Sequence, residues 1–283
     1  MGLNALQMAA LIRQRFNHGE AKLPVLPEAV IKVRDIVNHP DKGAKEISKV
    51  IGDDPTFSTT VLRIANSAKF KSGSNDIRSL PMAIQRLGGR QTLQLLIAIS
   101  SQVHMQVKNK PLQKILRNVS AHSLLVAIAA QQLARLLQNT PPEEAFLAGI
   151  VHDVGVSAVI CAVPDELAGC SRDDQLEILR ELHREMGGRL LNSWGMPDVF
   201  STVASHHGIE ADDRPREELL DYIDAADFMV QRSRNIPLFD AISDSVEAEF
   251  FPPIQRLGIT ETHLAAVEVE LESDLSEFES ITG

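Results

Sequence analysis

The sequence is poor in cysteine and in positive charge, and each shortage argues against certain kinds of site and partner. Cys161 and Cys170 are the only cysteines in 283 residues, and they do not form a CxxC pair. A disulfide framework or a cysteine-rich zinc site is therefore not expected, and reduced thiols fit a cytoplasmic protein. Asp and Glu (38) outnumber Lys and Arg (28), which gives a net charge of −10. We therefore expect no nucleic-acid partner, because phosphate binding is normally driven by clustered cations.

The sequence also lacks a long uninterrupted apolar run. The longest strictly apolar run covers residues 124–130, far short of the roughly 20 residues that cross a bilayer. Arg13 and Arg15 break the apolar stretch at the N-terminus, which does not have the profile of a signal peptide. We expect a cytoplasmic protein that neither crosses nor binds a membrane.

What is present is helical periodicity, and no stretch shows sustained strand alternation bounded by hairpin turns. The predicted fold class is all-α. Gly, Pro, Asn and Asp separate the apolar stretches of the first third into short helices, whereas the later pattern is longer and more continuous. The expected helices include 44–51, 56–68, 81–87, 92–103, 112–137 and 219–230.

Two lobes are predicted, because Lys108, Asn109, Lys110 and Pro111 interrupt two apolar helices. We place an N-terminal helical lobe at 1–110 and a second helical lobe, with a C-terminal helical extension, at 111–283. The acidic helical pattern over 261–278 in that extension is typical of a solvated face.

Histidine carries the main chemical signal, because five of the nine histidines lie between residues 122 and 207. His152 and Asp153 are adjacent on a predicted helix that begins near Pro141, about 100° apart around its axis, so both can lean toward one ion. His122 lies on the preceding predicted helix and Asp227 on a later one. Four ligands from three packed helices would form a site in the bundle core. Imidazole and carboxylate ligands suit Mn, Fe, Ni or Zn.

Each of these residues also has a simpler interpretation. A single buried histidine is more often hydrogen-bonded into a core than bound to a metal. His206 and His207 could end a helix before Gly208, where a cationic side chain complements the negative end of the helix dipole.

Many spaced motifs resemble the HDOD family of bacterial signalling proteins. The resemblance covers roughly residues 20–235. It rests on Leu23-Pro24-Val25-Leu26-Pro27-Glu28, Asp54-Pro55, the LRIANSA stretch of 62–68, Ile77-Arg78-Ser79-Leu80, Leu87-Gly88, His122-Ser123, Phe146-Leu147-Ala148-Gly149, His152-Asp153-Val154-Gly155, His183 with Gly187, Trp194-Gly195-Met196-Pro197 and His206-His207.

The resemblance implies a two-lobed HDOD bundle whose C-terminal lobe is of the HD type. By motif, His122, His152, Asp153 and Asp227 correspond to the metal quartet of HD proteins. His183, His206 and His207 correspond to positions that bind a second metal in the related HD-GYP phosphohydrolases. Val156 stands where active HD-GYP proteins have a phosphate-neutralising lysine, and the GYP sequence is absent.

Two functions follow as hypotheses. The first is a bacterial signal-transduction module that binds a signalling protein or a small phosphorylated ligand, with an HD-type site able to hold one or two divalent metal ions. The alternative is a metal-dependent phosphohydrolase, in which the ions lower the pKa of a bound water, Asp153 is the catalytic carboxylate, and Arg184 or Arg189 neutralises a phosphate. Redox chemistry at a di-iron centre is a third hypothesis, and no residue in the sequence specifically favours it. The sequence does not indicate the oligomeric state.

Overall fold

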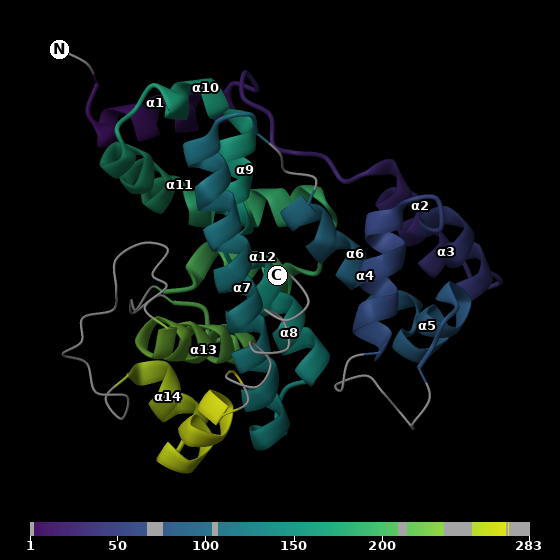
Figure 1. Cartoon of the computed structure of the whole chain (residues 1–283). Helices are drawn as coiled ribbons and strands as arrows, with labels where there is room; N and C mark the ends of the chain where they lie inside the picture. The colour runs from purple at the N-terminus through teal and green to yellow at the C-terminus, as the bar shows by residue number, and fades with distance from the viewer. Residues whose placement is uncertain are drawn as a thin grey trace. The chain divides into compact units, whose positions relative to one another are not determined.

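The computed structural model describes residues 3–66, 76–103, 107–208, 214–234, 251–269 and 271, and the described residues contain helices and no strands. The predicted all-α class is confirmed. The chain forms two compact units, one of Val25–His104 and one that joins Met1–Pro24 to Met105–Gly283. Figure 1 shows the helices of both units.

The smaller unit is built from short helices whose ends are fixed by local hydrogen bonds. Its helices are α2 (Glu28–Val37), α3 (Ala44–Ile51), α4 (Pro55–Asn66), α5 (Leu80–Leu87) and α6 (Gly89–Val103). Asp54 caps α4, because its Oδ1 accepts the amide protons of Thr56 (2.8 Å) and Phe57 (3.2 Å). The side chain of Asn66 bonds both the amide and the carbonyl of Ile77 at 2.7 Å. These polar residues therefore specify the fold of this unit.

The larger unit is a bundle of longer helices around a continuous apolar core. Its elements are α1 (Ala5–Asn17), α7 (Lys110–Leu137), α8 (Pro142–Val151), α9 (Val154–Ala162), α10 (Pro164–Ala168), α11 (Arg172–Ser193), α12 (Asp198–His206), α13 (Glu218–Arg234) and α14 (Pro252–Leu257). A further helical stretch covers 261–269, within the predicted 261–278, and the rest of that prediction lies outside the described residues apart from 271.

Helix α1 belongs to the larger unit, although the predicted lobes placed it in 1–110. Ile12 of α1 is fully buried in the core that α11 also lines. On the outside, Arg13 pairs with Glu181 at 3.0 Å and with Glu185 at 2.8 Å. The lobe boundary at 110/111 stays a prediction, but the first helix packs against α11 within the larger unit.

The α8–α9 stretch, Pro142–Ala162, is the one described segment long and apolar enough to cross a membrane. In this structure 83% of its most apolar window is buried inside the protein, as is usual for core helices. The stretch is not one continuous helix. His152 and Asp153 form a turn between α8 and α9, which corrects the expectation that both lie within a helix.

Two glycines let the backbones around this turn approach one another closely. A Cβ on Gly149 of α8 would overlap the backbone of Ala127 on α7, and a Cβ on Gly155 of α9 would overlap the carbonyl oxygen of His183 on α11. These contacts draw α7, α8–α9 and α11 together. As a result, the turn that carries His152 and Asp153 lies against the two helices that carry His122 and His183.

Candidate metal centre

Six of the seven sequence-predicted site residues meet inside the larger unit. They come from different helices. His122 lies in α7, His152 and Asp153 in the α8–α9 turn, His183 in α11, His207 directly after α12, and Asp227 in α13. All are buried except Asp227, whose side chain is 15% exposed.

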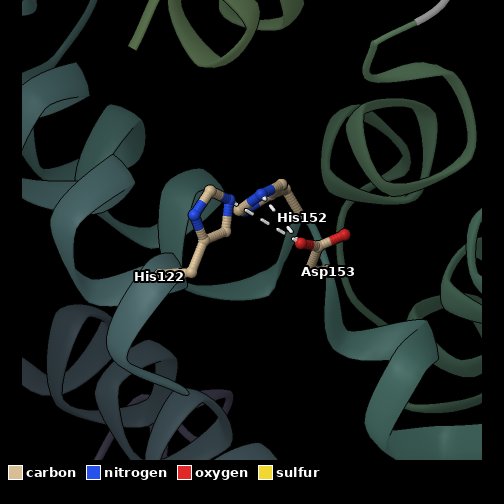
Figure 2. Close-up of side chains that lie close together, drawn as sticks. All are labelled: His122, His152 and Asp153. Carbon is tan, nitrogen blue, oxygen red and sulfur yellow. Dashed lines mark ion pairs between the residues drawn. The ribbon is translucent and has the colours of Figure 1, made fainter. Parts of the chain in front are cut away.

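The carboxylate of Asp153 is the centre of this cluster. Its Oδ2 lies 3.4 Å from the Nε2 of His152 and 3.9 Å from the Nε2 of His122. Figure 2 shows both ion pairs as dashed lines. Its Oδ1 lies 3.2 Å from the Nε2 of His207 and 3.8 Å from the Nε2 of His183. Each oxygen therefore faces two imidazoles, and Asp153 belongs to both groups of side chains that could hold an ion.

Asp227 extends the first of these groups. Its Oδ1 lies 3.0 Å from the Nε2 of His122. Gln231, one turn further along α13, donates from its amide nitrogen to both oxygens of Asp227 at 3.0 Å. The second carboxylate is thus held in place from its own helix and points at the same imidazole as Asp153.

Backbone carbonyls fix the tautomers of three of the histidines. The Nδ1 of His152 donates to the carbonyl of Gly149 at 2.7 Å, and that of His207 donates to Val203 at 3.2 Å. The Nδ1 of His183 lies within 3.0 Å of two carbonyls of its own helix. In a neutral ring the proton is then on Nδ1 and the lone pair is on Nε2, the atom that faces Asp153.

Lone pairs directed at a carboxylate call for a cation between them. An imidazole Nε2 and a carboxylate oxygen repel each other unless a proton or a metal ion lies between them. Two ligand atoms about 2.1 Å from one ion lie roughly 3.4 Å apart at a tetrahedral angle, which is near the distance from His152 to Asp153. Among the described residues, the buried Nε2 of His152 has no hydrogen-bond partner. The donor set therefore fits a divalent transition metal.

A model of a known protein family matches most of this chain. The HDOD domain family matches residues 23–209. The chain belongs to the HDOD family. An uncharacterized protein of Treponema pallidum (strain Nichols) is 23% identical over 217 residues, which are 72% of this chain and 40% of that protein. This HDOD protein thus spans less than half the length of that relative.

Solved structures share the fold of this HDOD protein. One from Shewanella amazonensis SB2B, provisionally named a metal-dependent phosphohydrolase, has a TM-score of 0.74 at 19% identity, covering 95% of this chain and 99% of that one. An HDOD domain protein of unknown function from Geobacter sulfurreducens scores 0.64 at 22% identity, covering 96% of each. A protein from Marinobacter aquaeolei VT8, provisionally named for signal transduction, scores 0.61 at 16% identity, covering 99% of this chain and 68% of that one.

The electrostatics of the HDOD site place negative charge on Asp153. Burial favours its neutral form, but His152, His207 and His183 outweigh burial and hold its pKa well below the usual range. Burial lowers the pKa of His152, and it lowers the pKa of His183 to about 3. Burial also opposes the charged form of His207, but its hydrogen bond to Asp153 and the nearby carboxylates raise its pKa.

Two of these histidines are thus kept neutral and one is favoured as a cation. Neutral imidazole is the form that binds a metal. The hydrogen bond between the Nε2 of His207 and Asp153 favours the charged form of His207, which would offset part of the negative charge of that carboxylate.

His206 is the predicted residue that the structure does not bring into this cluster. Its ring nitrogen Nδ1 donates to the carbonyl of Thr202 at 2.9 Å, and it belongs to neither group of candidate ligands found among the described residues. Its assignment as a ligand stays a prediction. His207, the next residue, occupies the position beside Asp153.

The two arginines considered for phosphate binding also differ. The side chain of Arg189 donates to Asn17 at 2.9 Å and to Glu185 at 3.4 Å, so it joins α11 to α1. Arg184 is half-buried, which lowers its pKa, while Asp153 and Asp224 favour its charged form. Of the two arginines, Arg184 is therefore the one that interacts electrostatically with the carboxylates of the site.

Sequence reasoning missed a second group of buried carboxylates beside the site. Asp221 and Asp224 precede Asp227 on α13 at intervals of three residues, and both are buried. Spacing of this kind puts side chains on one helical face. A run of Asp at 221, 224 and 227 was therefore the signal that could have identified them.

Proposed function

We propose that this protein is a regulatory HDOD module whose His/Asp cluster binds one or two divalent transition-metal ions. The observation that supports it best is the set of buried imidazoles that direct Nε2 at the two oxygens of Asp153. His122, His152, Asp153 and Asp227 would hold a first ion, and His183 and His207 would share Asp153 around a second. Mn, Fe, Ni and Zn all suit these ligands.

Metal binding is proposed to act on the arrangement of the helices. The candidate ligands come from α7, the α8–α9 turn, α11, the end of α12, and α13, so a bound ion would supply positive charge that ties these elements together. The result would be a change in the helical surface that a signalling protein or a small phosphorylated ligand could sense. The Marinobacter protein of similar fold is named for signal transduction, which supports a role in signalling. We place the module in the cytoplasm.

A phosphohydrolase is the second candidate, and the sharing of Asp153 by two candidate ion groups favours it. Hydrolytic sites with two ions commonly use such a bridging carboxylate. In that reaction Asp153 would orient the attacking water and Arg184 would neutralise the phosphate. Two features count against it. Val156 is fully buried where a lysine would contact phosphate, and Asp153 itself is only 4% exposed.

Metal content distinguishes a metal site from a hydrogen-bonded core. We expect untagged wild-type protein to carry near-stoichiometric transition metal by elemental analysis. We expect His152→Ala and Asp153→Ala to lose it, because each removes a ligand that directly faces the others. His206→Ala is the matched control and should retain the metal, since that ring lies outside the cluster.

Absence of metal from the wild type, even after reconstitution with Mn²⁺, Fe²⁺, Ni²⁺ or Zn²⁺, would refute the metal site. Metal retained by Asp153→Ala would place the ion elsewhere. Loss of one ion in His206→Ala would show that His206 is a ligand and that this part of the structure rearranges on loading.

The same preparations decide between regulator and hydrolase. We expect metal-loaded wild type to release no phosphate or alcohol from a panel of phosphomonoesters, phosphodiesters and nucleotides beyond the level of Asp153→Asn. Turnover that requires metal and falls at least about 100-fold in Asp153→Asn would instead establish the hydrolase, since loss of a catalytic carboxylate has an effect of that size.

A further inference from the structure

Three carboxylates on one face of α13 connect the candidate metal centre to the C-terminal part of the chain. Asp227 faces His122 in the cluster. Asp224 and Asp221 lie one and two turns earlier and face the guanidinium groups of Arg214 and Arg256. One helix thus carries both a candidate ligand and a buried ionic network.

Asp224 holds the end of α12. Its Oδ1 accepts the amide proton of Gly208 at 2.8 Å, and its Oδ2 accepts from Arg214 at 2.5 Å. Gly208 follows His207 directly and has a φ of +67°, which glycine adopts without strain. Asp224 therefore fixes the turn that sets the position of His207.

Arg214 connects Asp224 to Asp221. It donates from its other terminal nitrogen to the Oδ1 of Asp221 at 2.6 Å, and its side chain is only 7% exposed. A buried guanidinium shared by two carboxylates makes charge-assisted hydrogen bonds of fixed geometry. A shift of either carboxylate must then move the other.

Arg256 closes the network from α14. Its Nε lies 3.0 Å from each oxygen of Asp221, and its terminal nitrogen lies 2.7 Å from Oδ1. Figure 1 shows α14 packed beside α13. Helix α14 lies beyond residues 23–209, the segment that matches the HDOD family, so membership of the family does not assign it a role.

We propose that α14 sets the metal affinity of the His/Asp cluster through Arg256. Without Arg256, Arg214 is the one arginine among the described residues that pairs with both Asp221 and Asp224, and its hold on Asp224 weakens because buried charge requires a nearby partner. The Gly208 turn then loosens and His207 leaves its place beside Asp153. Arg256 is thus a positioning residue that acts from outside the cluster, and this inference rests on the proposed metal binding.

The test compares Mn²⁺ and Zn²⁺ dissociation constants of the full-length wild type, Arg256→Gln and Arg256→Lys by calorimetric titration. We expect Arg256→Gln to weaken binding about tenfold, within the usual range of coupling between sites. Arg256→Lys should fall between the two, since it keeps the charge but loses the paired geometry. Arg256 is 40% exposed, so these variants should fold.

Hydrogen exchange supplies a second readout. Coupling between two sites is reciprocal, so Mn²⁺ should slow amide exchange in α14 and at Gly208 of the wild type, and much less in Arg256→Gln. Arg15→Gln is the matched control. Arg15 is 31% exposed and pairs with Glu166 of α10, which carries no cluster residue, so its metal affinity should equal that of the wild type.

The outcomes separate this inference from the proposed function. A wild type that binds neither ion would overturn both. A wild type that binds metal with the same affinity as Arg256→Gln would overturn only the role of α14, and so would an equal weakening in Arg15→Gln. Weakening confined to the Arg256 variants, with loss of metal-dependent protection in α14, would establish the coupling.

Discussion

Replacing Gly155 with alanine is expected to lower the free energy of unfolding of the larger unit by about 3 kcal/mol, at the upper end of overpacking effects. The added Cβ would overlap the carbonyl oxygen of His183, which belongs to the backbone of α11. A helix backbone cannot rotate away as a side chain can, so α9 and α11 must separate. Urea unfolding followed by the fluorescence of Trp194, the only tryptophan and a buried residue of this unit, measures the loss.

Gly169→Ala is the control for removing a glycine from the same unit. A Cβ at Gly169 would meet the carbonyl oxygen of Glu166 at 3.5 Å, an ordinary contact, and the backbone there is right-handed helical. We expect a change within about 0.5 kcal/mol, the usual range for tolerated substitutions. A Gly155→Ala protein as stable as Gly169→Ala would show that α9 and α11 are not in contact as described.

The helices were largely predictable because their signals are local. Apolar spacing predicted 44–51 and 112–137, and the structure has helices at Ala44–Ile51 and Lys110–Leu137. The break at His152 and Asp153 was not predictable from the same pattern. The apolar residues on either side continue without interruption, and the turn is stabilised by close packing of Gly149 and Gly155 against neighbouring helices.

The candidate site was predictable in residue types but not in geometry. The resemblance to HDOD proteins marked both His206 and His207. Only His207 faces Asp153, because α12 ends at His206 and the backbone leaves helical geometry at His207. That end is fixed by the bond from Gly208 to Asp224, a contact between residues far apart in sequence that no local pattern reveals.

The ionic network beside the site shows the same limit. The spacing of Asp221, Asp224 and Asp227 predicts three carboxylates on one face of a helix. The sequence does not predict that these carboxylates have different partners. Arg214 lies in the non-helical segment before α13 and Arg256 in α14, so tertiary packing decides that two carboxylates pair with arginine while the third faces His122.

Arg214→Met is expected to lower the free energy of unfolding at pH 8 by about 3–5 kcal/mol, the usual result of removing one partner of a buried ion pair. Methionine keeps much of the aliphatic volume but leaves Asp224, whose side chain is 3% exposed, and Asp221 without that cation. The loss can be measured by urea unfolding followed by Trp194 fluorescence. Arg13→Met, which removes a surface pair with Glu181 and Glu185, should cost no more than about 1 kcal/mol.

Acid should partly restore the Arg214→Met protein. Burial raises the pKa of Asp224 to about 6 even with Arg214 present, whereas an unfolded aspartate titrates near 3.9. The folded protein therefore takes up a proton that the unfolded chain does not, and stability gains from this group as the pH falls from about 6 to 4. Loss of Arg214 raises that pKa further, so the folded variant takes up this proton at a higher pH than the folded wild type does. The deficit relative to wild type should therefore shrink as the pH falls from 8 to about 6, and stay constant below that, where both proteins gain equally. A deficit that stays constant or grows between pH 8 and 6 would mean that Asp224 is not the buried charge that Arg214 compensates.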